Sequence, residues 1–199
     1  MKKKSVEKAL GFLTLAGYYH HLVQNILEKT RESNPHVVFG SKETIDKYDE
    51  ITKWSDFRVI VPTLFLFYHG LELQLKGLLA FHNKVEGIHS LEKLLLLVRE
   101  MEGLPVEVIA IAERHIDIKN INPFIQSFIK TNGISIDDLY MALRYPTDKK
   151  DSREFSYFDL KYKEGKIIPY IESLITDCKK LNEETGKYYY QYRPILFKQ

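Results

Sequence analysis

Four polar residues lie at helical spacing inside a segment that is otherwise almost entirely apolar. They are His69, Glu72, Lys76 and Asn83, within residues 64–97. At about 100° per residue they fall within roughly 60° of one another, so they form one polar stripe on a predicted helix. A carboxylate four residues before a lysine is spaced for an ion pair, and a histidine beside a carboxylate is a common metal-ligand or proton-transfer combination.

A metal centre built on His69 and Glu72 would need a second such pair on another helix, as in carboxylate-bridged bundles. His82 and His115 have no acidic companion at that spacing, and no glutamate lies three residues before either residue of the pair 20–21. We therefore expect no metal and no cofactor.

The stripe needs partners if its helix lies in the middle of a bundle, because an unpaired buried charge costs several kcal/mol. Glu72 and Lys76 can pair with each other. Arg144, followed by Tyr145 and the helix-stopping Pro146, could clamp Glu72 or an anionic ligand, or could simply interact with the end of its own helix. Two interpretations stay open for the stripe, a narrow solvated face or the wall of a pocket.

The elements that must position these residues are predicted to be helices with short connections. Pro62 predicts a start or a kink in the central helix. A small β-hairpin is predicted before the last helix. It would consist of Phe155 to Tyr162, the polar Lys163 to Lys166, and then Ile167-Ile168. The expected helices span residues 5–29, 41–52, 54–83, 90–101, 106–118, 122–130, 135–145 and 169–186.

This pattern predicts an all-α, up-and-down helical bundle with the hairpin as an insertion. Residues 1–186 should form one domain, followed by an aromatic and basic C-terminal tail over 187–199. The tail could stack bases and neutralise phosphates, or dock on its own bundle or on a partner subunit.

Composition narrows the class of protein only broadly. The chain has 199 residues, a net charge of +2 and a single cysteine, Cys178. One cysteine excludes an intramolecular disulfide and fits a cytoplasmic protein. The basic start imitates a signal peptide, but Glu7 and Lys8 interrupt it, and no uncharged run reaches the roughly 18 residues that span a bilayer. We expect no export and no membrane.

The segment 65–97 resembles the HEPN superfamily of helical-bundle proteins. The resemblance rests on Glu72-Leu73-Gln74-Leu75-Lys76 within an apolar helix, a short loop, and His89-Ser90-Leu91 leading into a Leu-rich helix. The later part of the chain is also similar to many noncatalytic members. It contains Leu143-Arg144-Tyr145-Pro146, followed by a polar loop and a closing helix. The match covers about half of the chain, through short motifs.

The resemblance implies a bundle that is often dimeric and belongs to prokaryotic toxin–antitoxin, phage-defence or stress systems, frequently beside a minimal nucleotidyltransferase. Active members carry an arginine and, after four to six residues, a histidine, which cleave RNA without metal. Here that spacing occurs at Arg31 and His36, directly after the first helix rather than late in the bundle.

We therefore expect a noncatalytic binding or regulatory module that forms a homodimer. Its pocket or partner surface should involve Glu72, Lys76, His89, Arg144 and Tyr145, and RNA or a nucleotidyltransferase are candidate partners. One alternative is a HEPN-type ribonuclease using Arg31 and His36. Another is a structural protein that recruits a partner through its C-terminal tail.

Overall fold

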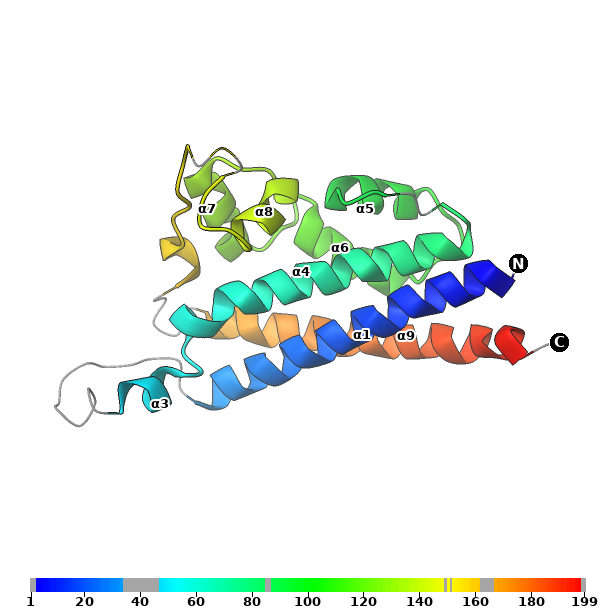
Figure 1. Ribbon diagram of the computed structural model, residues 1–199, viewed down its shortest axis with the longest axis horizontal. Helices are drawn as coiled ribbons and strands as arrows, with labels where there is room; N and C mark the ends of the chain where they lie inside the picture. Colours follow the sequence, from blue (N-terminus) through cyan, green and yellow to red (C-terminus); the bar gives the residue numbers. More distant parts are fainter. Residues whose placement is uncertain are drawn as a thin grey trace.

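The computed structural model describes residues 3–33, 47–84, 87–148, 150, 152–161 and 167–197. Within these residues the protein is all-α and contains no strand. The long helices α1 (Lys3–Glu32), α4 (Asp56–Phe81) and α9 (Ile168–Phe197) lie lengthwise beside one another, with both termini at the same end (Figure 1). The fold is a helical bundle, as the sequence predicts.

Shorter helices cover the bundle on the side of α4 that is away from α1 (Figure 1). They are α5 (Leu91–Arg99), α6 (Val106–Ile116), α7 (Pro123–Asn132) and α8 (Ile136–Ala142). Helix α6 also contacts α9. The short α3 (Tyr48–Thr52) lies at the end opposite to the termini.

Helix α4 is the centre of the bundle. Every residue from Gly70 to Phe81 is buried, which is what an almost wholly apolar helix requires. The helix begins at Asp56, so Pro62 lies inside it and does not start it. Because proline lacks an N–H, the carbonyl of Arg58 loses its usual partner in the helix.

Helix α1 approaches α4 closely at two glycines seven residues apart on α4. A Cβ atom added at Gly77 would lie 2.6 Å from Cδ2 of Leu13 and 3.3 Å from the backbone oxygen of Ala9. A Cβ atom added at Gly70 would lie 2.8 Å from Nε2 of His20. The two glycines therefore allow α1 and α4 to approach closely, and a larger residue at either position would push the two helices apart.

Side-chain caps begin α5, α7 and α8 at the residues where the sequence predicts these helices to start. Ser90 accepts a hydrogen bond from the backbone N–H of Lys93, and Asn122 accepts one from that of Phe124. Ser135 and Asp138 form a reciprocal capping box at the start of α8. Local polar signals of this kind satisfy the first N–H groups of a helix, so these boundaries follow from the sequence.

The predicted β-hairpin is wrong for the part of it that the structure describes. Residues Phe158–Leu160 form a 3₁₀ turn, Ile168 already belongs to α9, and residues 162–166 lie outside the described residues. The Tyr157 hydroxyl donates to the carbonyls of Ala142 and Tyr145, 2.6 and 2.9 Å away. The alternating aromatic residues thus anchor an irregular segment on neighbouring helices instead of pairing with a strand.

The last helix does not end near Gly186, and residues 187–197 are not a separate tail. Helix α9 continues to Phe197 because its aromatic residues pack on the bundle. The ring centroids of Tyr188 and Tyr192 lie 5.6 and 4.6 Å from that of Phe81. Docking of this segment on its own bundle, one of the alternatives that the sequence leaves open, is confirmed for the described residues.

The close α1–α4 contact predicts opposite effects for two Gly→Ala changes. Gly77→Ala should lower the free energy of unfolding by about 1 to 3 kcal/mol, because the added methyl group overpacks the contact with Leu13. Gly11→Ala, on α1 with nothing within 4 Å of the new methyl group, should raise it by up to about 1 kcal/mol. Urea denaturation measures both, and equal stabilities of the two variants would contradict the close contact.

Candidate functional site

A buried ion pair on α4 holds an exposed histidine from the loop before α5. Oε1 of Glu72 lies 2.6 Å from Nζ of Lys76 and 3.0 Å from Nδ1 of His89. The side chains of Glu72 and Lys76 are 6% and 8% exposed, whereas that of His89 is 79% exposed. We call these three residues the Glu72 cluster. The structure brings together three of the five residues predicted for the partner surface.

The Glu72 carboxylate is ionised at neutral pH. Burial favours its neutral form, but the neighbouring His69, Lys76 and His89 side chains outweigh burial and lower the pKa of Glu72 to about 2. Near neutrality a carboxyl group with so low a pKa has no proton to donate and is a weak base. Glu72 therefore acts as a fixed negative charge.

The charges of the pair determine which nitrogen of His89 carries a proton. An ionised carboxylate can only accept hydrogen bonds and an ammonium group can only donate them. Nδ1 of His89 lies 3.0 Å from the Glu72 oxygen and must therefore donate a hydrogen bond to it. Nδ1 also lies 3.4 Å from Nζ of Lys76, but both atoms are donors, so this contact is not a hydrogen bond. In the neutral ring Nε2 is then the acceptor, on a side chain that is largely exposed.

The loop that carries His89 is fixed from a second direction by α8. The Ser90 hydroxyl donates to Oδ2 of Asp137, 2.6 Å away, and the backbone N–H of Glu92 donates to Oδ1 of the same carboxylate. Asp137 lies in the first turn of α8. The His89 imidazole is thus anchored to α4 through its ring and to α8 through its neighbour.

Four half-buried rings from three helices lie beside the cluster. We call Tyr19, Phe65, His69 and Tyr140 the aromatic row. The Tyr140 hydroxyl lies 2.9 Å from Nδ1 of His69, the edge of Tyr19 meets the His69 ring at 4.8 Å between centroids, and the Phe65 and His69 rings are parallel at 6.1 Å. Nδ1 of His69 is 3.7 Å from Glu72, which joins the row to the cluster.

Sequence reasoning missed three members of this row. Phe65 precedes His69 by four residues, so helical spacing alone could have placed it on the same face. Tyr19 and Tyr140 come from other helices and carry no local signal. Burial and the nearby Glu72 charge raise the pKa of Tyr140 against the opposing charge of Arg144, so its hydroxyl stays protonated at neutral pH.

The ion pair predicted between Glu72 and Arg144 is not formed among the described residues. Helix α8 ends at Ala142, and the exposed Arg144 guanidinium lies over the ring of Tyr145, 5.2 Å from its centroid. Oε1 of Glu72 is already occupied by Lys76 and His89. Arg144 and the 44% exposed Tyr145 therefore stand outside the Glu72 cluster.

Three other predicted residues lie away from this cluster or outside the described residues. Arg31 is exposed in the last turn of α1, and His36 lies outside the described residues, so their pairing is untested. Asn83 follows the end of α4 with a positive φ of 57° and accepts a hydrogen bond from Ser5. Asn83 therefore does not belong to the polar stripe on α4.

A second charged cluster lies in the core between α6 and α9. Asp177 accepts from Nε2 of His115 at 2.8 Å and from Arg114 at 2.7 Å. Both Asp177 and His115 are buried, and Phe67 packs edge-on against the His115 ring. This cluster holds α6 against α9, and of its three side chains only that of Arg114, 44% exposed, reaches solvent.

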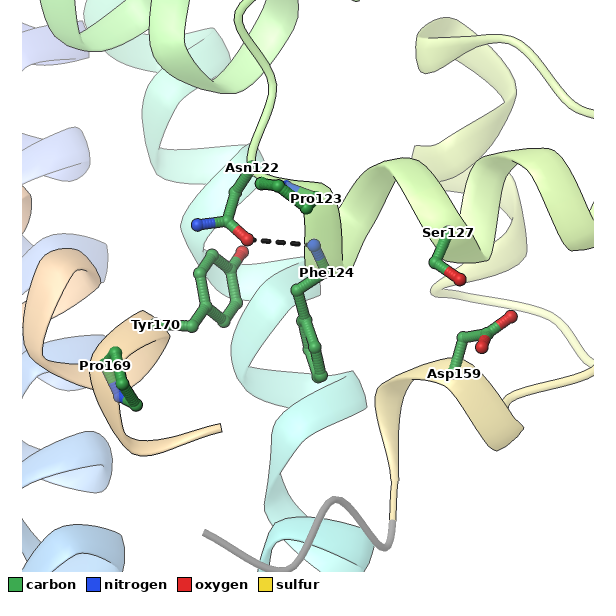
Figure 2. Close-up of a pocket in the computed structure, with 7 residues that line it drawn as sticks. All are labelled: Asn122, Pro123, Phe124, Ser127, Asp159, Pro169 and Tyr170. Atoms are coloured by element: carbon green, nitrogen blue, oxygen red, sulfur yellow. Dashed lines mark hydrogen bonds between the residues drawn. The ribbon is translucent and has the colours of Figure 1, made fainter. Parts of the chain in front are cut away.

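A surface hollow of about 430 Å³ lies where α7 meets the start of α9 (Figure 2). Its polar groups do not converge, because Asn122 caps α7 and the hydroxyl of Tyr170 lies beside it, away from Asp159 (Figure 2). We assign it no function. The lining residues are Asn122, Pro123, Phe124, Ser127, Asp159, Pro169 and Tyr170.

Three further findings bear on the class of protein. Within the described residues no group of three or more histidine, cysteine or acidic side chains is arranged to hold a metal ion. In the same part of the chain no helix has the length and apolar character needed to cross a bilayer. Comparison with protein-family models, curated proteins and solved structures finds no match to this chain.

The buried pair predicts a pH-dependent loss of stability in Glu72→Gln. At neutral pH the variant should lose about 3 kcal/mol, because Lys76 is left buried without its partner. The Glu72 pKa falls from an ordinary value near 4.5 to about 2 on folding, so its stabilisation is complete above pH 4.5 and disappears as pH falls towards 2.

Denaturation with urea at a series of pH values measures this difference. Glu92→Gln, on the exposed face of α5, is the matched control and should change stability by less than about 0.5 kcal/mol. The stabilising role of the ion pair would be contradicted if Glu72→Gln lost as little stability as Glu92→Gln does. It would also be contradicted if the loss of stability in Glu72→Gln did not change with pH down to the folded-state pKa of Glu72.

Proposed function

We propose that this chain is a HEPN-like, noncatalytic binding or regulatory module that acts as a homodimer. Its partner surface is the Glu72 cluster with the aromatic row and the adjoining Arg144 and Tyr145. By the same resemblance, its setting is a prokaryotic toxin–antitoxin, defence or stress system, with a nucleotidyltransferase as a candidate protein partner. The observation that carries the proposal is the exposed His89 ring held in one orientation by the buried Glu72–Lys76 pair.

Preorganisation of His89 supports binding as the role of this surface. A side chain that is already fixed in the free protein loses little conformational entropy when a partner contacts it. Its exposed Nε2 is an acceptor in the neutral ring and becomes a donor in the charged ring. The surface thus offers one defined polar contact beside half-buried aromatic rings, and aromatic residues are enriched in protein interfaces.

The electrostatics favour binding over catalysis at this site. Glu72 has a pKa of about 2 and lies 2.6 Å from Nζ of Lys76, so its carboxylate is not poised to transfer a proton at neutral pH. Their evident role is to position His89. The alternative ribonuclease, which would use Arg31 and His36, involves a different part of the chain.

An apolar stripe on α1 extends the surface and supports a protein as its occupant. Leu15, Tyr18 and Leu22 are 43%, 65% and 46% exposed, and their spacing of three and four residues places them on one outward face. Tyr19, in the aromatic row, connects this stripe to α4. A second copy of the chain would bury both stripes in one symmetric contact, as in most homo-oligomers.

The proposal predicts that a charge on the α1 stripe dissociates the dimer. Light scattering during size-exclusion chromatography should give the wild-type protein a mass of twice 23.4 kDa. Leu22→Glu should weaken self-association at least about tenfold, because a carboxylate buried at an interface is unpaired. Ile118→Glu, at an equally exposed apolar residue after α6, is the control and should leave the dimer intact.

Two results would contradict the proposal. One is a monomeric wild-type protein, or a dimer that Leu22→Glu does not weaken. The other is cleavage of RNA by the purified protein in the presence of EDTA that is abolished by His36→Ala, which would favour the metal-independent ribonuclease. RNA that stays intact under these conditions agrees with a noncatalytic module.

A further inference from the structure

The last turns of α9 have two faces of different character. Tyr188 and Tyr192 point inward onto Phe81. Tyr190 and Phe197 point outward and are 76% and 70% exposed. Large rings exposed to this extent, seven residues apart on one helix face, are not needed to hold the helix on the bundle.

Arginine and tyrosine side chains connect these outward rings. The guanidinium carbon of Arg193 lies 5.5 Å from the centroid of Tyr189 and 5.6 Å from that of Phe197, within the range of cation–π contacts. The Tyr189 and Tyr190 rings meet edge-on at 6.1 Å. The outward face is therefore a connected array of rings with a cation among them. We call Tyr190, Arg193 and Phe197 the α9 platform.

Cationic side chains outnumber carboxylates at the end of the bundle that carries the platform. The first turns of α1 pack against this end of α9, and both chain termini lie there (Figure 1). Residues 3–13 and 187–197 carry five cationic side chains and one carboxylate, that of Glu7. Lys3, Lys4 and Lys8 are exposed. Lys187 pairs with Glu184.

We infer that the α9 platform binds single-stranded nucleic acid. Exposed rings stack unpaired bases without regard to sequence, and Arg193 and the lysines at the same end of the bundle contact phosphates. Seven residues of helix span about 10.5 Å, close to three steps of a stacked strand at about 3.4 Å each. In a duplex the bases already stack on one another, so the rings have no free base to contact.

Charge complementarity selects this occupant over a second copy of the chain. Two platforms facing each other would bring their cations together. A polyanion neutralises them and also uses the rings. The platform contains no residue of the Glu72 cluster, so this inference stands independently of the dimer and its partner surface.

Fluorescence anisotropy with labelled single strands of about 12 nucleotides, one RNA and one DNA, tests the inference. The full chain should bind them and bind the matched duplex at least about tenfold more weakly. Tyr190→Ala with Phe197→Ala should weaken binding at least about tenfold, since each stacked base contributes on the order of 1 kcal/mol or more. Arg193→Ala should reduce the slope of log Kd against log salt by about 0.7, the value of one phosphate contact on a single strand.

Phe158→Ala is the matched control, because Phe158 is 71% exposed and belongs to the 3₁₀ turn Phe158–Leu160, a segment at the end of the molecule away from the termini (Figure 1). It should leave the affinity unchanged, and Phe197→Tyr, which keeps a ring, should stay within about twofold of wild type. Circular dichroism confirms that each variant is folded.

Three outcomes would overturn the inference. The first is an affinity for single strands no greater than that for the duplex. The second is a loss of affinity in the Phe158→Ala control equal to that in the platform variant. The third is binding to phosphatidylserine vesicles that is abolished when Tyr190→Ala and Phe197→Ala are combined, while the affinity for nucleic acid is unchanged. If the RNA and DNA strands bind equally, stacking and phosphate contacts suffice. A preference for RNA adds a contact to the 2′-hydroxyl and still supports the inference.

Discussion

The arrangement of helices around α4 depends on one buried ion pair. From Gly70 to Phe81 every residue of α4 is buried, and this stretch contains the Glu72 carboxylate and the Lys76 ammonium. Because the two are four residues apart on one helix, each supplies the partner that the other needs. A charged helix can then occupy the centre of an apolar bundle without an unpaired charge.

The same ion pair also positions the loop before α5. Its negative end also accepts the hydrogen bond from His89, which holds the loop before α5, and Ser90 in that loop bonds to Asp137 of α8. A buried ion pair is seldom more stabilising than apolar residues of the same size would be. Its value here is specificity, since it fixes where the loop sits and which way an exposed imidazole faces.

The parts of this structure that the sequence predicts well are those with local causes. The caps at Ser90, Asn122 and Ser135 and the pairing of Glu72 with Lys76 each need only residues within four positions. The errors have tertiary causes. Alternating aromatics after Phe155 suggested a strand, although they contact neighbouring helices, and Gly186 suggested a helix end that packing on Phe81 overrides. Tyr140 meets His69 across 71 residues of sequence, which no periodicity reveals.

The most direct test of the central role of the Glu72–Lys76 pair is the tautomer of His89. Long-range ¹H–¹⁵N NMR spectra of the neutral ring should show the proton on Nδ1, because this nitrogen donates to Glu72. The spectra of Glu72→Gln should lose this preference. A wild-type His89 with its proton on Nε2, the same as in the variant, would show that the buried pair does not orient the ring.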